Sequence, residues 1–379
     1  MQSAAVPPPA PYELGSVPDF RTGGSFTVGV EEELMLVDPA GELLGAAGTE
    51  VVDAVRHLSP EGVVTGEIYA DQVELNSPVC HDAEAVVGSL ARLRARVLSH
   101  GACAMAVGLH PTAPFGAVAL STTDRYAAIA EEYAGLLRTP TAALQVHVGL
   151  PDADAAMLAY RALRTQVPLL RALGAGTPFW HGIDSGLASS RSAVIRSYPR
   201  TTVPPLLRTW EEFVERTEQL VVSAEAPGPT YVWWDLRPRP ELGTLEVRVM
   251  DSQPDLRRVA ALTALVQGIA RHGVAAPRTA DLPDHVLAVN DERATRYGLD
   301  ARVTDDDGRL RPLREVGRSA LARARAELGT DGLARPLDEV EQMLTEPGEP
   351  HRQREVARRA GLTTLLTDLV DRTTAGLLG

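Results

Sequence analysis

The chain has 379 residues and a net charge of −13, and it contains no lysine, so all 37 basic residues are arginine. The absence of lysine excludes a Walker A phosphate loop and a pyridoxal-phosphate enzyme, because both need a lysine side chain. A negative net charge without a basic run argues against a nucleic-acid partner, and no run approaches the roughly 18 apolar residues of a membrane span.

Two further features lead us to expect a cytoplasmic protein. The two cysteines, Cys80 and Cys103, are too few for a disulfide framework. The first residues, MQSAAVPPPAPYELG, lack the basic region and the apolar run of a secretory signal. We expect residues 1–24 to form a flexible arm and residues 25–379 to form a single domain.

Five segments alternate between apolar and polar residues, which is the pattern of half-buried strands. They are 27–37, 71–76, 144–150, 231–237 and 244–250. Their polar positions carry charged or amide side chains where an ordinary solvated strand carries Thr, Ser and Lys. These residues are Glu31, Glu33, Gln72, Glu74, Gln145, His147, Asp235, Arg237, Glu246 and Arg248. Gathered on one sheet, they would bind hard cations and an anionic ligand.

Helical periodicity appears mainly in the second half of the chain. We expect helices at 82–99, 152–173, 255–272, 282–297, 314–328 and 355–377, so that the part from about 255 to 379 is largely helical. Residues 38–41 suit a tight turn, and 174–205 is a long aperiodic stretch of the kind that is usually functional. Because strands and helices mix without strict βαβ alternation, we predict an α+β fold with an antiparallel sheet.

Glu31 and Glu33 form the sharpest local signal. Two carboxylates two residues apart on a strand point the same way and can share a divalent ion such as Mg²⁺, although a solvated strand face is the alternative. Glu32 falls in the apolar row, where the pattern offers only a strand edge or a local bulge as an explanation.

The other polar positions each have a structural alternative. Glu246 and Arg248 could be a metal ligand and a phosphate clamp, or an exposed ion pair of little energetic value. Asp235 and Arg237 could pair with each other or contact a substrate. His147 is either a ligand or phosphate contact or a histidine satisfied within the sheet. The triplet that ends in Ser190 and Arg191 could hold phosphate oxygens, but a tripeptide is a weak signal.

Seven blocks of the sequence together resemble the carboxylate–amine ligases of the type 2 glutamate–cysteine ligase group. The blocks are TVGVEEELMLVDP, EIYADQVELNSPV, AVGLHPTAPF, ALQVHVGLPD, GTPFWHGIDSGLASSRSAVIRSYPRT, WWDLRPRPELGTLEVRVMD and NDERATRYGLDA. They extend from about Phe26 to Ala301, with a weaker match at 351–354. The resemblance departs at Ile195 and Tyr198, where the group suggests bulkier, tryptophan-like residues.

The resemblance implies a glutamine-synthetase-like catalytic domain, with an antiparallel sheet curved into a funnel-like half-barrel and helices packed outside. It also implies an ATP-dependent enzyme that uses Mg²⁺ or Mn²⁺ and forms an amide bond through an acyl phosphate. By motif, the metal ligands would be Glu31, Glu33, Glu74 and Glu246, and the catalytic residues Arg248 and Arg191. The residues that contact ATP or substrate would be His147, Gln145, Gln72, Asp235, Arg237, Ser190 and Arg352.

Several alternatives stay open at this point. The partners would be a small carboxylic acid and an amine, with glutamate and cysteine as the default of the group, but a natural-product amide synthetase with another acid has the same signature. A guanidino-kinase-like phosphotransferase, a metal-dependent amide hydrolase or a non-catalytic binding protein could use the same fold. The oligomeric state is also open, with a homodimer as one alternative.

Overall fold

The computed structural model of the protein describes residues 15, 17–121, 124–133, 135–277, 280–305 and 307–377. Its centre is an antiparallel sheet with the strand order β2-β3-β4-β1-β6-β10-β9 and with β5 beside β1. The strands of this sheet are β1 (Val28–Val37), β2 (His57–Ser59), β3 (Gly62–Gly66), β4 (Gln72–Asn76), β5 (Cys103–Met105), β6 (Ala143–Gly149), β9 (Leu236–Arg239) and β10 (Thr244–Asp251). Two small hairpins pair β7 (Phe179–Trp180) with β8 (Ile183–Asp184), and β11 (Arg302–Thr304) with β12 (Leu310–Pro312).

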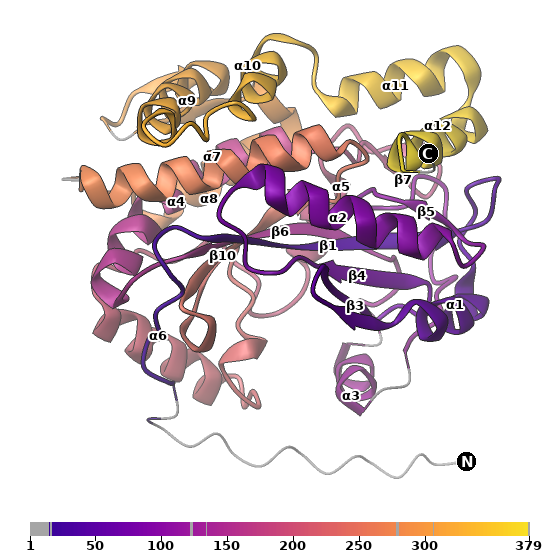
Figure 1. Cartoon of the computed structure of the whole chain (residues 1–379), viewed down its shortest axis with the longest axis horizontal. Helices are drawn as coiled ribbons and strands as arrows, with labels where there is room; N and C mark the ends of the chain where they lie inside the picture. Colours follow the sequence, from indigo (N-terminus) through magenta and orange to yellow (C-terminus); the bar gives the residue numbers. More distant parts are fainter. Residues whose placement is uncertain are drawn as a thin grey trace.

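Helices cover one face of the sheet and leave the other face open at its centre (Figure 1). The helices are α1 (Gly48–Val55), α2 (Ala83–Leu98), α3 (Asp124–Tyr133), α4 (Ala153–Gly174), α5 (Ser190–Ile195), α6 (Trp210–Ser223), α7 (Leu256–Ala275), α8 (Asp284–Tyr297), α9 (Leu313–Gly329), α10 (Leu337–Thr345), α11 (Glu349–Ala360) and α12 (Leu362–Thr374). Helices α2, α4 and α7 lie on the sheet, and α9 and α10 lie outside α7. None of the helices in the described part of the chain is long and apolar enough to cross a membrane.

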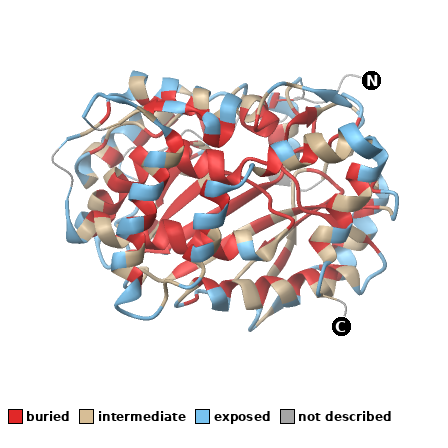
Figure 2. Ribbon diagram, turned by 90° about the horizontal axis from the view of Figure 1, so that it is seen from above, coloured by how far each residue is buried: buried red, intermediate tan, exposed pale blue. Residues whose placement is uncertain are grey.

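The two faces of the central strand β1 separate core from site. Val28, Val30 and Leu34 are buried in the main hydrophobic cluster beneath the helices, and Figure 2 shows this buried layer from above. Glu31 and Glu33 alternate with them and are only partly buried, on the open face. The predicted α+β class with an antiparallel sheet is therefore confirmed, and so is the alternation that predicted it.

Glu32 has a specific partner that the strand pattern did not predict. Its side chain is fully buried on the helical side of β1. The Arg94 guanidinium of α2 donates two hydrogen bonds to the Glu32 carboxylate, Nε to Oε2 at 2.8 Å and a terminal nitrogen to Oε1 at 2.6 Å. Arg94 also donates to the carbonyl oxygens of Gln253, Pro254 and Thr373. The buried ion pair with Arg94 explains the position of Glu32, and the predicted strand edge or bulge does not.

The predicted strand at 231–237 is wrong for most of its length. Residues Pro229–Tyr231 form a short 3₁₀ turn, and β9 begins only at Leu236. The amide of Trp233 donates to the carbonyl of Arg200, and the amide of Asp235 donates to that of Thr202. The backbone therefore bonds to a neighbouring loop, and alternation of side chains alone could not distinguish that loop from a sheet partner.

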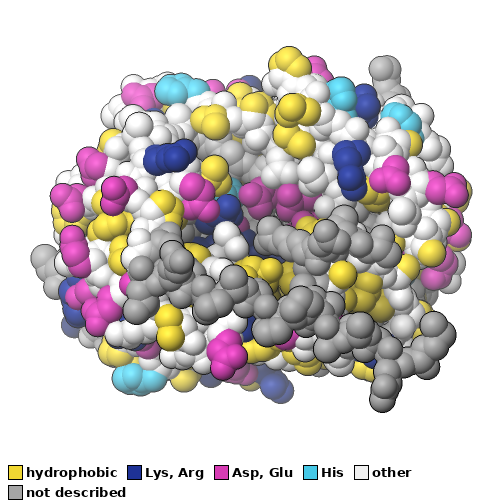
Figure 3. All heavy atoms as spheres, turned by 90° about the horizontal axis from the view of Figure 1, so that it is seen from below, with side chains coloured by type: hydrophobic (Ala, Val, Ile, Leu, Met, Phe, Trp, Pro, Cys, Tyr) yellow, Lys and Arg dark blue, Asp and Glu magenta, His cyan; other side chains and the backbone are white. Residues whose placement is uncertain are grey.

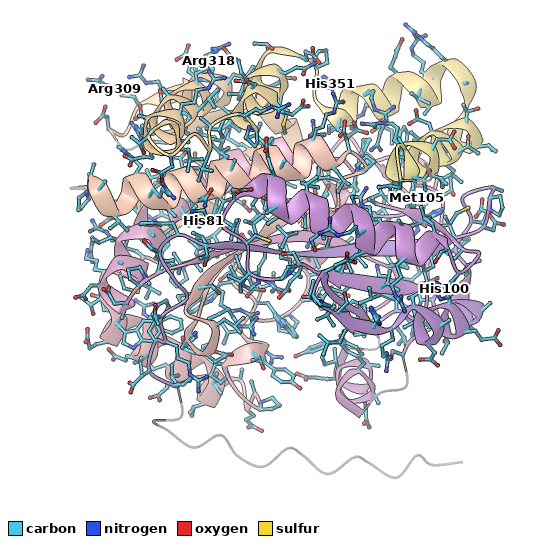
Figure 4. The ribbon with its side chains drawn as sticks, viewed as in Figure 1. His81, His100, Met105, Arg309, Arg318 and His351 are labelled. Carbon is cyan, nitrogen blue, oxygen red and sulfur yellow. The ribbon has the colours of Figure 1, made fainter. Side chains whose placement is uncertain are left out.

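The predicted C-terminal helix at 355–377 is two helices. Helix α11 ends at Ala360, and Gly361 adopts a φ of +86° before α12 begins. Glycine is the residue that most easily takes this left-handed conformation, so it ends a helix cleanly. The turn folds α12 back over β5, where Leu366 and Leu369 pack in one cluster with Met105, and Figure 4 shows Met105 below this helix.

Part of the predicted N-terminal arm contacts the sheet. Residues 1–14 and 16 lie outside the described residues, so most of the arm is not covered. The amide of Arg21 donates to the carbonyl of Pro240, and the amide of Gly23 donates to that of Leu150. Gly23 approaches Gly243 so closely that a Cβ added to it would lie 2.1 Å from the Gly243 carbonyl oxygen.

Candidate active site

The open face of the sheet contains a cavity of about 400 Å³. Charged side chains of both signs line it, and Figure 3 shows acidic and basic groups in this hollow. The charged lining residues are Glu31, Glu33, Glu67, Glu74, Asp235 and Glu246, with Arg191, Arg237, Arg239 and Arg248. The acidic residues come mostly from the β3–β4–β1 side and the arginines from β9, β10 and α5, so the cavity has an acidic side and a basic side.

Like charges face each other on the acidic side. Glu33 of β1 lies directly opposite Glu74 of β4 in the antiparallel register. Carboxylates in such positions repel each other, and both are partly buried here. Burial and the neighbouring Glu67 raise the pKa of Glu33 to about 7. Burial, followed by Glu67 and Glu31, raises the pKa of Glu74 well above its usual value. In the absence of a cation, this arrangement costs stability.

Glu67 belongs to the acidic side, but sequence reasoning missed it. It follows β3 directly, and it lines the cavity beside Glu74. Its pKa is raised, first by burial, although its carboxylate accepts a hydrogen bond from the amide of Ile68 at 3.0 Å. Glu67 stands outside the alternating segment 71–76, so the strand pattern gave no signal for it. Its place in the EIYADQVELN block was the one available clue.

A second cluster joins three strands. Single ligand atoms from Glu31, His147 and Glu246 all lie within 4.8 Å of one another. The ring of His147 is oriented by Thr244, whose hydroxyl lies 3.0 Å from Nδ1. The other ring nitrogen, Nε2, lies 3.1 Å from Glu31 Oε1, but it is buried and its geometry gives it no hydrogen-bond partner. Burial works against ionisation of Glu31, and His147 beside it nevertheless holds the pKa of Glu31 below its usual value.

These two clusters suit a hard divalent cation. Carboxylate oxygens are the ligands that Mg²⁺ prefers, and imidazole also binds transition metals such as Mn²⁺. Opposed carboxylates and a buried imidazole nitrogen that makes no hydrogen bond are features that a bound cation would satisfy. The donors that fit are Glu31, Glu33, Glu67, Glu74, His147 and Glu246.

Glu246 links the cluster of Glu31 and His147 to the basic side. It is fully buried, and Arg237 donates to its Oε2 from Nε at 2.9 Å, while Arg248 bonds to Oε1. Burial alone would raise the pKa of Glu246, but Arg237 and Arg248 hold it well below its usual value. Burial lowers the pKa of Arg237 to about 10 despite the pairing. All these residues therefore stay charged at neutral pH. Glu246 and Arg248 therefore do not form the exposed ion pair that was one alternative from the sequence, because Glu246 is buried.

Asp235 and Arg237 do not pair with each other, which rules out one of the two alternatives for them. Arg171 of α4 donates to Asp235 Oδ2 at 2.9 Å, and Arg196 at the end of α5 bonds to both Asp235 oxygens. Both arginines also bond to Asp291 of α8. Asp235 lines the cavity, but its charge is already satisfied by this four-residue network.

The remaining predicted residues fall into two groups. Gln72 and Gln145 line the cavity; Gln72 donates from Nε2 to the carbonyl of Thr141, and Gln145 donates to Glu33. Ser190 and Arg352 are not among the residues that line it. Ser190 is buried and bonds to Ser185, and Arg352 of α11 pairs with Glu349 and Asp368. Their predicted contacts with a substrate have no geometric support at this cavity.

Apolar and aromatic side chains line another part of the cavity. They belong to Ile68, Tyr69, Tyr126, Ile129, Leu137, Ile195, Tyr198 and Trp233. The hydroxyls of Tyr69 and Tyr198 donate to the backbone carbonyls of Thr139 and Leu136. The two tyrosines thus have their polar ends satisfied by the protein. Apolar lining of this kind lowers the local dielectric constant, and charged groups beside it interact more strongly.

Comparison with known proteins agrees with this geometry. The model of glutamate–cysteine ligase family 2 matches residues 27–367. A candidate glutamate–cysteine ligase 2-3 of Rubrobacter xylanophilus is 36% identical over 367 residues, covering 94% of this chain and 99% of its own length. A candidate glutamate–cysteine ligase 2 of Paracoccus denitrificans is 35% identical over 311 residues, covering 78% of this chain and 81% of its own.

Solved structures share the fold at low sequence identity. The glutamate–cysteine ligase of Francisella tularensis, solved in complex with AMP, has a TM-score of 0.69 at 12% identity, covering 95% of this chain and 90% of its own. A bifunctional glutathione synthetase of Pasteurella multocida has a TM-score of 0.67 at 16% identity, covering 93% of this chain and 52% of its own.

The sheet with its converging carboxylates and arginines, taken with these matches, defines an ATP-dependent ligase. The chain belongs to glutamate–cysteine ligase family 2.

Proposed function

We propose that this protein joins a small carboxylic acid to an amine in an amide bond, with ATP converted to ADP and phosphate through an acyl phosphate. The proposal rests on one observation. Carboxylates on β1 and β4 line the same cavity as arginines on β9, β10 and α5. Phosphoryl transfer needs such an arrangement, because it depends on positioning and charge neutralisation more than on covalent catalysis. Glutamate and cysteine, which the names of the relatives indicate, are the first substrates to test.

Magnesium ions would be held by the two clusters described above. Glu33, Glu67 and Glu74 would serve one position, and Glu31, His147 and Glu246 another. When bound, the ions would neutralise negative charge on the phosphates of ATP. The chain's own carboxylates then lose the mutual repulsion that adds to burial in raising the pKa of Glu33 and Glu74.

The arginines would act on the transferred phosphoryl group. Arg248 lines the cavity with its side chain 26% exposed, so part of its guanidinium can reach a ligand. Arg191 has a buried Nε without a hydrogen-bond partner. Guanidinium groups match the geometry of phosphate oxygens and stay charged, and they stabilise charge that develops during transfer.

The nucleoside would occupy an adjoining apolar slot. This slot, about 100 Å³, shares Thr230, Trp234, Arg237 and Arg239 with the main cavity. Phe213 and Pro229 contribute apolar surface to it. Phosphates near Arg237 and Arg239 would leave the base next to this surface. The apolar lining with Tyr69 and Tyr198, which does not reach this slot, would then be free for the organic substrates.

The reaction balances without a nucleophile from the protein. A carboxylate oxygen of the acid attacks the γ-phosphorus, and ADP leaves. The amine nitrogen then attacks the acyl carbon, inorganic phosphate leaves with the bridging oxygen, and the amine loses a proton. The apolar lining protects the acyl phosphate from hydrolysis between the two steps.

The proposal is tested with the full-length chain, MgATP, L-glutamate and L-cysteine. We expect ADP release that needs both the acid and Mg²⁺, and an equal amount of amide by mass spectrometry. Glu33→Gln should lower the rate by at least about 100-fold, whereas Glu42→Gln, an exposed residue on the same hairpin, should leave it unchanged. Amide hydrolysis without ATP would support the hydrolase instead, and phosphorylated product without an amide would support a phosphotransferase.

A further inference from the structure

One irregularity in β10 changes which side of the sheet Asp251 faces. From Thr244 to Val247, β10 pairs with β6 in one register, and from Met250 to Asp251 it pairs in a register shifted by one residue. Glu246 is opposite His147 on the cavity side before the shift, and Asp251 is opposite Ala143 after it. In an unbroken strand, residues 246 and 251 would face opposite sides, because side chains alternate. The bulge therefore brings Asp251 to the same side as Glu246.

Asp251 connects three backbone segments at that point. Its Oδ2 accepts from the amide of Gly176 at 2.9 Å and from the hydroxyl of Thr177 at 2.8 Å. Its Oδ1 accepts from the hydroxyl of Ser189 at 2.9 Å. The backbone of Gly108 passes so close that a Cβ there would lie 2.6 Å from the Asp251 carboxyl carbon. The carboxylate is fully buried and held from three sides.

Ser189 makes Asp251 the anchor of α5. The Ser189 side chain caps α5 by accepting from the amide of Ser192. The helix has only six residues, from Ser190 to Ile195. So short a helix has little stability of its own, because nucleation is costly. The position of its first turn is set by the groups that hold it, and that turn carries Arg191.

The geometry around Arg191 leaves its donors available. Its guanidinium is buried, and its NH1 lies 3.9 Å from Asp251 Oδ1, beyond hydrogen-bond distance. A second terminal nitrogen donates a long bond of 3.5 Å to the carbonyl of Arg248, and Nε has no partner. A carboxylate in direct contact would occupy these donors. Burial lowers the pKa of Arg191, and at 3.9 Å Asp251 opposes that effect in part while it leaves the fork open to a ligand anion.

We propose that Asp251 is a positioning residue for Arg191, and that the β10 bulge exists in this chain to bring the two together. Asp251 fixes the first turn of α5 through Ser189 and neutralises Arg191 without binding its donors. The inference rests on the proposed function, in which Arg191 contacts the transferred phosphoryl group. It assigns no chemical step to Asp251, which does not line the cavity.

The test is a double-mutant cycle with Asp251→Asn and Arg191→Ala. Asparagine keeps the size of the side chain and removes its charge. In the otherwise native chain, we expect Asp251→Asn to lower kcat about tenfold or more and to change KM for ATP less than threefold. In the Arg191→Ala background, the same substitution should change kcat less than twofold. Equal losses in both backgrounds would overturn the proposal, because a general structural defect does not depend on Arg191.

Two further variants keep the outcome decisive. Asp371→Asn, an exposed residue of α12, is the matched control and should leave kcat and the unfolding temperature unchanged. If Asp251→Asn does not fold, Ser189→Ala replaces it, since it unties α5 from Asp251 and should show the same dependence on Arg191. Native kcat in a folded Asp251→Asn protein would also overturn the proposal. If the wild-type chain releases ADP but makes no amide, the proposed function fails. The double-mutant cycle can then still be measured by ADP release, so the two failures are distinguishable.

Discussion

Glu33 and Glu74 lie directly opposite each other in adjacent antiparallel strands, and both are partly buried with their pKa values raised. Two facing carboxylates are unfavourable when no cation is bound, because opposite charges or apolar pairs are preferred in such positions. The arrangement becomes favourable only when a cation lies between or beside them. The site therefore lowers the stability of the fold when no cation is bound, and this loss of stability can be measured.

The first consequence is a dependence of stability on pH in the absence of metal. The pKa of Glu33 is about 7 in the folded protein against 4.5 for an unperturbed group. The folded state therefore binds more protons between these values, so the contribution of protonated Glu33 to stability is fully present below pH 4.5 and is lost as the pH rises through 7. We expect Glu33 to reduce the free energy of unfolding by roughly 1–3 kcal/mol across this window.

Urea unfolding in EDTA at pH 5 and pH 7.5 measures this effect. In Glu33→Gln the pH-dependent loss should be smaller by that amount, and Mg²⁺ should stabilise the wild type more at pH 7.5 than at pH 5. If the wild type and Glu33→Gln lost stability equally between the two pH values, the carboxylate would not be strained as described.

Glu246 is expected to matter to stability as well as to activity. In Glu246→Gln the buried Arg237 loses its counter-charge, and breaking a buried pair in this way costs about 3–5 kcal/mol. The comparison is urea denaturation of this variant and of Glu241→Gln, which changes a nearby glutamate whose side chain is more exposed. A Glu246→Gln protein as stable as the control would mean that Arg237 is solvated and not paired.

Arg248→Lys should separate charge from geometry. Lysine keeps the positive charge but lacks the planar fork that contacts two phosphate oxygens. We expect kcat to fall by at least about tenfold with a smaller change in KM for ATP, since the contact is made mainly in the transition state. Steady-state kinetics with varied ATP measures both parameters. Unchanged kcat with a raised KM would make Arg248 a residue that binds ATP in the ground state.

The buried pair of Glu32 and Arg94 should be structural only. Arg94→Met leaves Glu32 buried without its partner and should cost about 3–5 kcal/mol, whereas the double variant Glu32→Leu with Arg94→Met should recover much of the loss. Arg92→Met, two residues away on the exposed side of α2, should change stability by less than about 1 kcal/mol. A single variant without loss would contradict the buried pair.

The sequence predicts which side chains face the site wherever the strands are regular. The two-residue period identified Glu31, Glu33 and Glu74 because β1 and β4 are ordinary strands with one apolar face. The same period failed at 231–235, where the polar residues alternate but the backbone bonds to the loop at 200–202. Alternation reports where side chains point, and it does not identify the backbone partner.

Long-range pairing is the part that the sequence could not give. Glu32 and Arg94 are 62 positions apart, and neither has a local pattern that indicates its partner. The β10 bulge has no marker among the residues 247–250, so the turn of Asp251 toward Arg191 was not predictable either. Glu67 was missed because it stands just after a strand that shows no charged alternation. The break at Gly361 could have been found, since a glycine that closely follows basic residues such as Arg358 and Arg359 is a common helix end.

The most direct test of the account follows the oxygen atoms of the acid. L-glutamate labelled with ¹⁸O in both side-chain carboxylate oxygens is incubated with the full-length chain, MgATP and L-cysteine, and the phosphate released is analysed by mass spectrometry. An acyl phosphate requires that one ¹⁸O atom passes from the acid to phosphate for each amide bond formed. We expect that transfer at a one-to-one ratio. Amide formation with unlabelled phosphate would contradict the central claim.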